Sequence, residues 1–295
     1  MRTQRLSLIE RYWTDVALLG LLALLYAPLL VHWYDGWLRK SISTEHEYFS
    51  HGIIGLPFAA YLAWTNRKRW QRLPEDTTGR SKLIGSLLLL FAGIFYLSGL
   101  PDAVNLSFPM MLTAICLWLK GFEGLKLQGF ALCLVALATP NEIPYLIAPY
   151  TLPLQVFIAG TAGFILNQFG MNAVVQGIYL FVNDRIVEVA PYCAGLKMLF
   201  TSLYVGLMLL YWTGNWKHRS FRTLFFTATI VVSVIANIIR NTFLAFFHGT
   251  GQEQAFHWLH DGWGGDVYSA GMLGLLVVLS NQLEQFFVSD DSSSV

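Results

Sequence analysis

Eight apolar stretches, each near the length needed to cross a membrane, constrain this chain more than any other feature of its sequence. A hydrocarbon core of about 30 Å requires roughly 20 residues of helix, and inside lipid only helices and closed barrels satisfy their own backbone hydrogen bonds. With 55% hydrophobic and 13% charged residues, the sequence predicts an all-α polytopic membrane protein with about eight transmembrane helices. The stretches lie at residues 16–31, 52–66, 83–100, 103–119, 127–139, 195–213, 222–243 and 266–287.

The ends of the chain set the expected domain organisation. The first apolar run follows three arginines and ends in His32-Trp33-Tyr34, an aromatic belt typical of a membrane interface, so we interpret it as a retained first span. We expect residues 1–288 to form a single membrane domain and residues 289–295 to form a short polar cytoplasmic tail.

The positions of the cations predict the orientation in the membrane. Four clusters hold fourteen of the nineteen lysines and arginines, and such residues near short loops stay in the cytoplasm. We therefore expect a multi-pass protein of the plasma (inner) membrane with both termini inside. The net charge of +1 offers no basic surface to nucleic acid and excludes it as a partner. The clusters are residues 2–11, 67–82, 120–126 and 217–222.

Residues 140–192 fit no simple crossing, because another span here would place the last cation cluster outside. Residues 144–169 are interpreted as a re-entrant or surface-lying helix pair, broken by Pro149 and Pro153. The alternating apolar segments of residues 178–189 then predict a small extracytoplasmic β-hairpin that turns at Asn183-Asp184.

This topology brings three chemically complementary types of side chain to the outer face. Cys193 begins one span, Arg240 lies near the outer end of the next, and His257 and His260 occupy the loop before the last. A cysteine is a strong nucleophile as a thiolate, an imidazole exchanges a proton near neutral pH, and a guanidinium stabilises a thiolate or an oxyanion. We expect a nucleophilic site here, supported by Lys197 one turn after Cys193 and by Asn237 beside Arg240, with no cofactor and no metal.

Two other classes of function remain open. A metal-dependent membrane hydrolase could use His257 and His260, completed by His248, Glu253 or Asp266. A transporter or scaffold would need no reactive thiol, although transporters place polar groups near the bilayer midplane. The two remaining cysteines, Cys116 and Cys133, lie among apolar residues within predicted spans, where we expect them only to pack.

Four ordered segments resemble the exosortase/archaeosortase family, and most of all the cyanobacterial exosortases. The resemblance runs from about residue 45 to residue 275. Its segments are Tyr48-Phe49-Ser50-His51-Gly52, Val189-Ala190-Pro191-Tyr192-Cys193-Ala194-Gly195-Leu196, Asn237-Ile238-Ile239-Arg240 and His260-Asp261-Gly262-Trp263-Gly264.

The resemblance implies a membrane-embedded cysteine protease or transpeptidase. Its partners would be the lipid bilayer and exported proteins with a C-terminal tripartite sorting signal of the PEP-CTERM type, processed at the outer face. By motif, Cys193 would be the nucleophile, Arg240 the invariant cation and His260 the general base. Ser50 and His51 belong to the first segment and would support the site. The chain departs from the family at Ala194, where a serine is usual.

Overall fold

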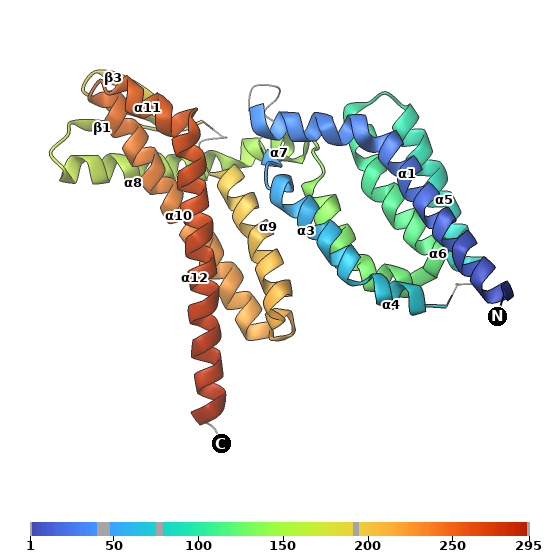
Figure 1. Ribbon diagram of the computed structural model, residues 1–295. Helices are drawn as coiled ribbons and strands as arrows, with labels where there is room; N and C mark the ends of the chain where they lie inside the picture. The colour runs from blue at the N-terminus through green and yellow to red at the C-terminus, as the bar shows by residue number, and fades with distance from the viewer. Residues whose placement is uncertain (1, 40–47, 75–78, 191–194, 294–295) are drawn as a thin grey trace. The chain divides into compact units, whose positions relative to one another are not determined.

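The computed structural model describes residues 2–39, 48–74, 79–190 and 195–293. All eight predicted apolar stretches lie in helices, apart from a few residues at their ends (Figure 1). The chain forms two compact units, Met1–Asn141 and Glu142–Val295.

The described part of the first unit consists of helices and short connections. Two predicted spans, 103–119 and 127–139, belong to α6, which is interrupted at Gly121 (φ 60°, ψ −153°). Glycine adopts this backbone at little cost, because it has no Cβ atom. The buried Lys120 donates from Nζ to the carbonyl oxygen of Leu73 at 2.7 Å, so this interruption lies beside the basic helix α4. Two predicted cytoplasmic clusters therefore meet in the structure. The helices are α1 (Arg2–Arg39), α3 (Gly52–Thr65), α4 (Arg67–Arg72), α5 (Gly79–Leu97) and α6 (Pro101–Ala138).

The expected aromatic belt is wrong for Trp33. Its ring is fully buried, and its indole N–H donates to Oδ1 of Asn105 on α6 at 2.7 Å. A buried amide oxygen needs a donor, and Trp33 supplies it inside the protein. His32 and Tyr34 remain exposed.

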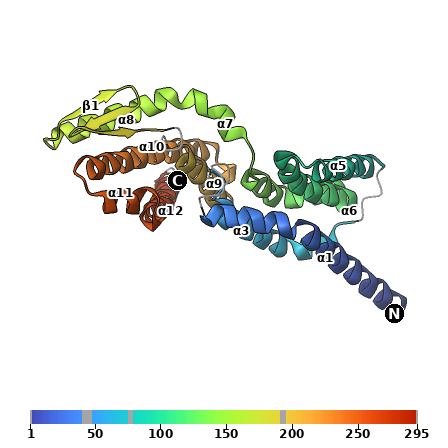
Figure 2. The same cartoon turned by 90° about the horizontal axis from the view of Figure 1, so that it is seen from above.

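The second unit combines helices with one small sheet. The helices are α7 (Ile143–Ile147), the 3₁₀ helix η1 (Ala148–Thr151), α8 (Leu152–Gln168), α9 (Leu196–Thr213), η2 (Asn215–Lys217), α10 (Arg219–Gly249), α11 (Glu253–His260) and α12 (Trp263–Ser293). The strands are β1 (Ala173–Gln176), β2 (Tyr179–Val182) and β3 (Arg185–Glu188). Figure 2 shows the strands beside α8.

The predicted helix pair is present as α7 and α8. The break lies in η1, which contains Pro149, whereas Pro153 stands in the first turn of α8, a position that suits proline. By length and composition residues 143–168 could themselves span a membrane. However, α8 runs in a different direction from α10, against which it packs (Figure 1), and Phe157 and Phe164 are exposed on it. This direction favours the surface-lying interpretation.

The predicted hairpin is confirmed as β2 and β3, with Val182 paired to Arg185. Asn183 and Asp184 both have positive φ, 49° and 65°, which defines the type I′ turn that matches strand twist. The sheet also contains a strand that the sequence did not predict, β1, which pairs antiparallel with β2. Leu180 and Val182 pack with Ile158 and Ala162 of α8 in a common core.

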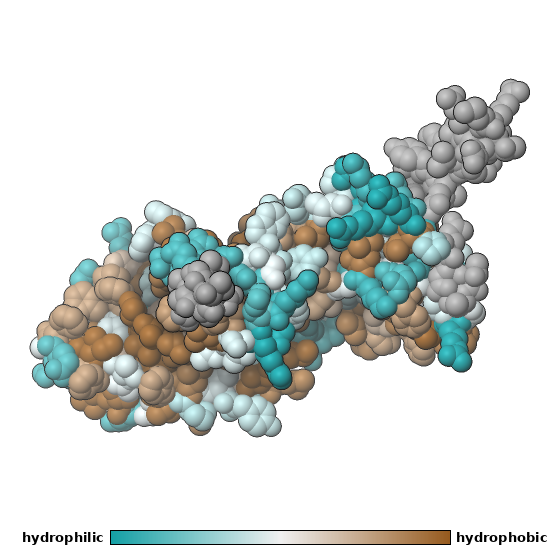
Figure 3. All heavy atoms as spheres, turned by 90° about the horizontal axis from the view of Figure 1, so that it is seen from below, coloured by the Kyte–Doolittle hydropathy of each residue, from teal (hydrophilic) through white to brown (hydrophobic). Residues whose placement is uncertain are grey.

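The surface of the described residues is that of a membrane protein. Six helical segments are long and apolar enough to cross a bilayer, and α3 is a shorter apolar helix. Large hydrophobic side chains are exposed along the helices, and Figure 3 shows hydrophobic residues over much of the surface, with hydrophilic residues in separate patches. Soluble monomers rarely expose such areas, so this is a multi-pass membrane protein. The six segments are Gly79–Leu97, Pro101–Ala138, Ile143–Gln168, Leu196–Thr213, Arg219–Gly249 and Trp263–Phe287.

Candidate functional site

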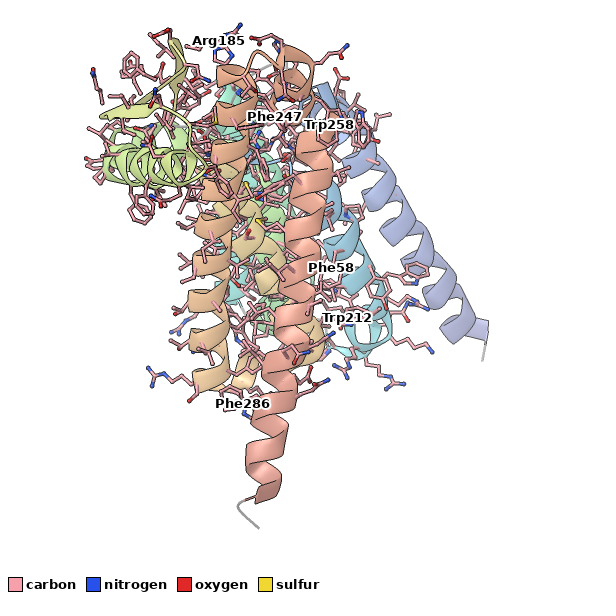
Figure 4. The ribbon with its side chains drawn as sticks, turned by 90° about the vertical axis from the view of Figure 1, so that its left-hand side faces the viewer. Phe58, Arg185, Trp212, Phe247, Trp258 and Phe286 are labelled. Carbon is pink, nitrogen blue, oxygen red and sulfur yellow. The ribbon has the colours of Figure 1, made fainter. Side chains whose placement is uncertain are left out.

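One end of the second unit gathers most of the residues that the sequence singled out. Figure 4 places Arg185, Phe247 and Trp258 at this end, and Trp212 and Phe286 at the opposite end. We call it the α11 end; it comprises the beginning of α9, the last four turns of α10, all of α11 and the beginning of α12.

The beginning of α9 lies against α10. Cys193, the predicted nucleophile, lies outside the described residues. Gly195, two residues later, is in the left-handed region (φ 82°), and a Cβ atom added to it would lie 2.6 Å from Cγ of Asn237. Asn237 is almost fully buried. Only glycine satisfies both the backbone angle and this close approach.

Arg240 follows Asn237 by nearly one turn of α10 and is half-buried. Its Nη2 donates to the carbonyl oxygens of His260 and Leu259, at 3.4 Å and 3.5 Å. These hydrogen bonds are long. They reach the last carbonyl groups of α11, where the partial negative charge of a helix C-terminus favours a cation. Arg240 therefore ties α10 to the end of α11.

The two predicted histidines share one carboxylate, that of Asp261. Its Oδ1 lies 2.5 Å from Nδ1 of His260, and its Oδ2 lies 3.2 Å from Nδ1 of His257. Burial raises the pKa of Asp261. The hydrogen bonds and the positive charge of the two imidazoles lower this pKa by more than burial raises it, so the pKa lies below its usual value. The carboxylate is therefore ionised at neutral pH.

The two imidazoles differ in their surroundings. The side chain of His260 is 26% exposed and that of His257 is 67% exposed. The ring of Phe256 stacks on that of His260, with centroids 5.2 Å apart and planes 10° apart. His260 is thus the better-fixed of the two.

Asp261 is a site residue that was not predicted from the sequence. It stands four residues after His257 and next to His260, and the first of these spacings places two side chains on one helical face. That spacing was the signal that could have found it.

The supporting residues occupy different parts of the chain. Lys197 is half-buried in the first turn of α9. Ser50 and His51 belong to the first unit, where His51 is buried and its Nε2 lies 3.1 Å from the carbonyl oxygen of Leu137. Burial lowers the pKa of His51 to about 4, although backbone hydrogen bonds oppose the shift. His51 is therefore neutral at pH 7, and the supporting roles of all three residues stay predictions.

The arrangement of side chains gives no support to the metal-dependent hydrolase, and the two remaining cysteines lie on α6. Among the described residues, no three His, Cys, Asp or Glu side chains are grouped to hold a metal ion. His257 and His260 instead direct Nδ1 to the same carboxylate. Cys116 is half-buried on α6, whereas Cys133 is exposed there; that neither has more than a packing role stays a prediction.

These features define a class: a multi-pass membrane protein in which, at one end of a helical unit, a guanidinium binds the backbone of a histidine whose imidazole contacts a carboxylate. The chain belongs to the family of transmembrane exosortases, whose family model matches residues 33–277. Membership supports a general role in membrane transpeptidation and the sorting of exported proteins. No curated protein and no solved structure matches the chain.

Proposed function

We propose that the chain is a cysteine protease or transpeptidase that removes a C-terminal sorting signal of the PEP-CTERM type at the outer face of the plasma membrane. Cys193 is the nucleophile, Arg240 the stabilising cation and His260 the general base. The observation that carries the proposal is the convergence on α10: Gly195 lies against Asn237, and Arg240 holds the carbonyl group of His260.

Covalent connectivity supports the assignment of Cys193. Two peptide units join it to Gly195, and each spans about 3.8 Å between Cα atoms. Gly195 touches Asn237, which precedes Arg240 by three residues. Cys193 is thus only two residues along the chain from a glycine that touches the helix carrying Arg240.

The length of α10 supports the proposed depth of the site. Arg222 belongs to the last cytoplasmic cluster, and Arg240 follows it by eighteen residues on the same helix. At about 1.5 Å per residue this is roughly 27 Å, close to the roughly 30 Å of a hydrocarbon core. Arg240 then lies near the outer boundary, where the cleavage motif of a membrane-anchored substrate emerges.

The proposed reaction has two steps. The thiol of Cys193 gives its proton to His260, and Sγ attacks the carbonyl carbon of the scissile peptide bond. The oxyanion that forms is stabilised by Arg240. When the C–N bond breaks, the leaving amine takes the proton from the imidazolium, and the upstream protein remains as a thioester. Water or an acceptor amine then attacks the thioester, His260 accepts its proton, and the returning thiolate is reprotonated.

The test is co-expression with an exported protein that carries a Pro-Glu-Pro motif, a hydrophobic helix and a basic tail. Mass spectrometry of that protein identifies its new C-terminus. We expect cleavage at the signal with the intact enzyme and none with Cys193→Ala or Cys193→Ser, at equal enzyme abundance. Cys116→Ala and Cys133→Ala are the matched controls and should process normally. Unchanged processing by Cys193→Ala would refute the proposal.

A second experiment addresses the metal-hydrolase alternative. Purified enzyme is treated either with a chelator or with a thiol-alkylating reagent. The proposal requires inactivation by the alkylating reagent alone. Inactivation by the chelator with recovery on adding zinc would support the alternative instead.

A further inference from the structure

We propose that Asp261 is a positioning residue for His260. It fixes the tautomer that carries hydrogen on Nδ1 and so leaves Nε2 as the nitrogen that accepts the proton of the nucleophilic thiol. The inference rests on the proposed function and adds to it a carboxylate that neither the motif comparison nor the family match assigns.

The first support is the hydrogen bonding of the carboxylate. An ionised carboxylate only accepts hydrogen bonds, so Nδ1 of His260, 2.5 Å from Oδ1, must be the donor. A hydrogen atom on Nδ1 leaves Nε2 as the basic nitrogen of the neutral ring. The low pKa of Asp261 keeps the acceptor ionised at neutral pH.

The second support is that three independent contacts hold this one residue. Asp261 holds Nδ1, the ring of Phe256 stacks on the imidazole, and Arg240 binds the backbone carbonyl group. A general base works best when its orientation is fixed before the reaction. The contacts come from α11, from the residue that follows it and from α10, so they do not require the substrate.

The neighbouring histidine makes a different set of contacts. His257 meets the same carboxylate at 3.2 Å, and its ring meets Phe256 edge to face at 5.5 Å and 80°. It is 67% exposed. We therefore assign the proton-transfer role to His260 and treat His257 as a competitor for Asp261.

The proton balance follows from this arrangement. Transfer of the thiol proton to Nε2 of His260 produces a thiolate and an imidazolium. The positive charge of the imidazolium then lies beside the carboxylate of Asp261, which accepts a hydrogen bond and does not take the proton. Asp261 thus favours the charge-separated pair, in which the cysteine is nucleophilic.

Alkylation of the thiol tests this without any substrate. The full chain is purified in detergent with Cys116→Ala and Cys133→Ala. Of its three cysteines, this leaves Cys193 alone. The rate of reaction with iodoacetamide is measured from pH 5.5 to pH 9, because only the thiolate reacts. An unactivated cysteine has a pKa near about 8.5, whereas the proposed pair should react well below that pH.

The decisive variant is Asp261→Asn. At pH 7 we expect alkylation to slow by about tenfold, between the roughly fivefold limit of an exposed ion pair and the about 10⁴-fold effect of the buried aspartate in serine proteases. Glu253→Gln is the matched control, since Glu253 is a half-exposed carboxylate of α11 that pairs with Arg185. It should leave the alkylation profile unchanged.

A double-variant series separates the possible routes. If Asp261 acts through His260, then Asp261→Asn has no further effect once His260→Ala is present, and retains its effect with His257→Ala. The opposite pattern would overturn the inference, as would an unchanged profile for folded Asp261→Asn in an otherwise activated enzyme. If the parent protein reacts only as an ordinary thiol, the proposed function itself fails.

Discussion

Replacing Arg240 by lysine separates the two roles that this residue can have. In the structure its guanidinium binds the final carbonyl groups of α11, which is an anchoring role. In the proposed mechanism the same group stabilises a thiolate or an oxyanion. Lysine keeps the charge and the length but loses the planar, two-pronged donor.

The structure indicates how much free energy Arg240 would contribute in each role. Both hydrogen bonds are long, 3.4 Å and 3.5 Å, and end on a helix C-terminus, where a cation contributes about 0.3–1 kcal/mol. Lysine can supply most of this interaction. Loss of one transition-state donor costs about 2.7–4 kcal/mol, or roughly a hundred- to a thousandfold in rate. The two roles therefore predict rates that differ by at least about twentyfold.

The assay is the yield of processed substrate per unit of folded enzyme. We expect both Arg240→Lys and Arg240→Ala to lose at least about a hundredfold in processing, with only a small change in melting temperature for the lysine variant. Arg222→Lys is the matched control: it lies on the same helix, with its guanidinium 5.1 Å from the Trp216 ring, and should process normally.

If Arg240→Lys processes substrate at a rate within about fivefold of the parent, the loss is no larger than an anchoring interaction explains. The arginine would then be a cap for α11, and the oxyanion would need another donor. A large loss of folded protein in Arg240→Lys would also contradict the reasoning, because the long hydrogen bonds are too weak to explain it.

Three further predictions concern orientation, backbone and pH. An impermeant thiol reagent should label Cys193 on intact spheroplasts, and labelling only after permeabilisation would reverse the topology. Gly195→Ala should lower the melting temperature more than Gly214→Ala: both glycines have positive φ, which costs about 1–2 kcal/mol for alanine, but only the first Cβ atom would meet Asn237. A melting temperature equal in the two variants would contradict this packing. Because the pKa of His51 is lowered from 6.5 to about 4, the unfolded chain binds more protons in this range. Stability should therefore fall as pH decreases from about 6.5 to about 4, by up to about 3 kcal/mol, and His51→Gln should flatten that part of the thermal-unfolding profile.

Local signals explain what could be predicted of the fold. The Asn183-Asp184 pair encodes its own turn, so the hairpin and its register follow from adjacent residues. The long apolar runs encode the helices in the same way. Strand β1 has only four residues, Ala173–Gln176, and depends on packing against α8 and β2. Its own sequence contains too little signal.

The sequence predicted which described residues lie at the candidate site better than it predicted which of their atoms are in contact. Charge placement brought Arg240 and His260 to the same end of the unit, and they do meet. However, the guanidinium contacts the backbone of His260. Every residue has a backbone carbonyl group, so the types of side chain in the sequence do not indicate such a contact. The burial of Trp33 was equally hidden, because its partner Asn105 lies 72 residues away in sequence. Such pairings depend on tertiary packing.

The last four turns of α10 also limit how this end of the protein can move. Gly195 rests on Asn237, Arg240 holds α11, and Gly249 lies so close to Val182 of the hairpin that an added Cβ atom would overlap it. The start of α9, α11 and the hairpin therefore all pack on α10. If α10 tilts, these three segments move with it as a rigid body. Opening of this end for a substrate should then leave the start of α9, α11 and the hairpin fixed relative to α10. A crosslink between α10 and the hairpin should therefore be tolerated during turnover.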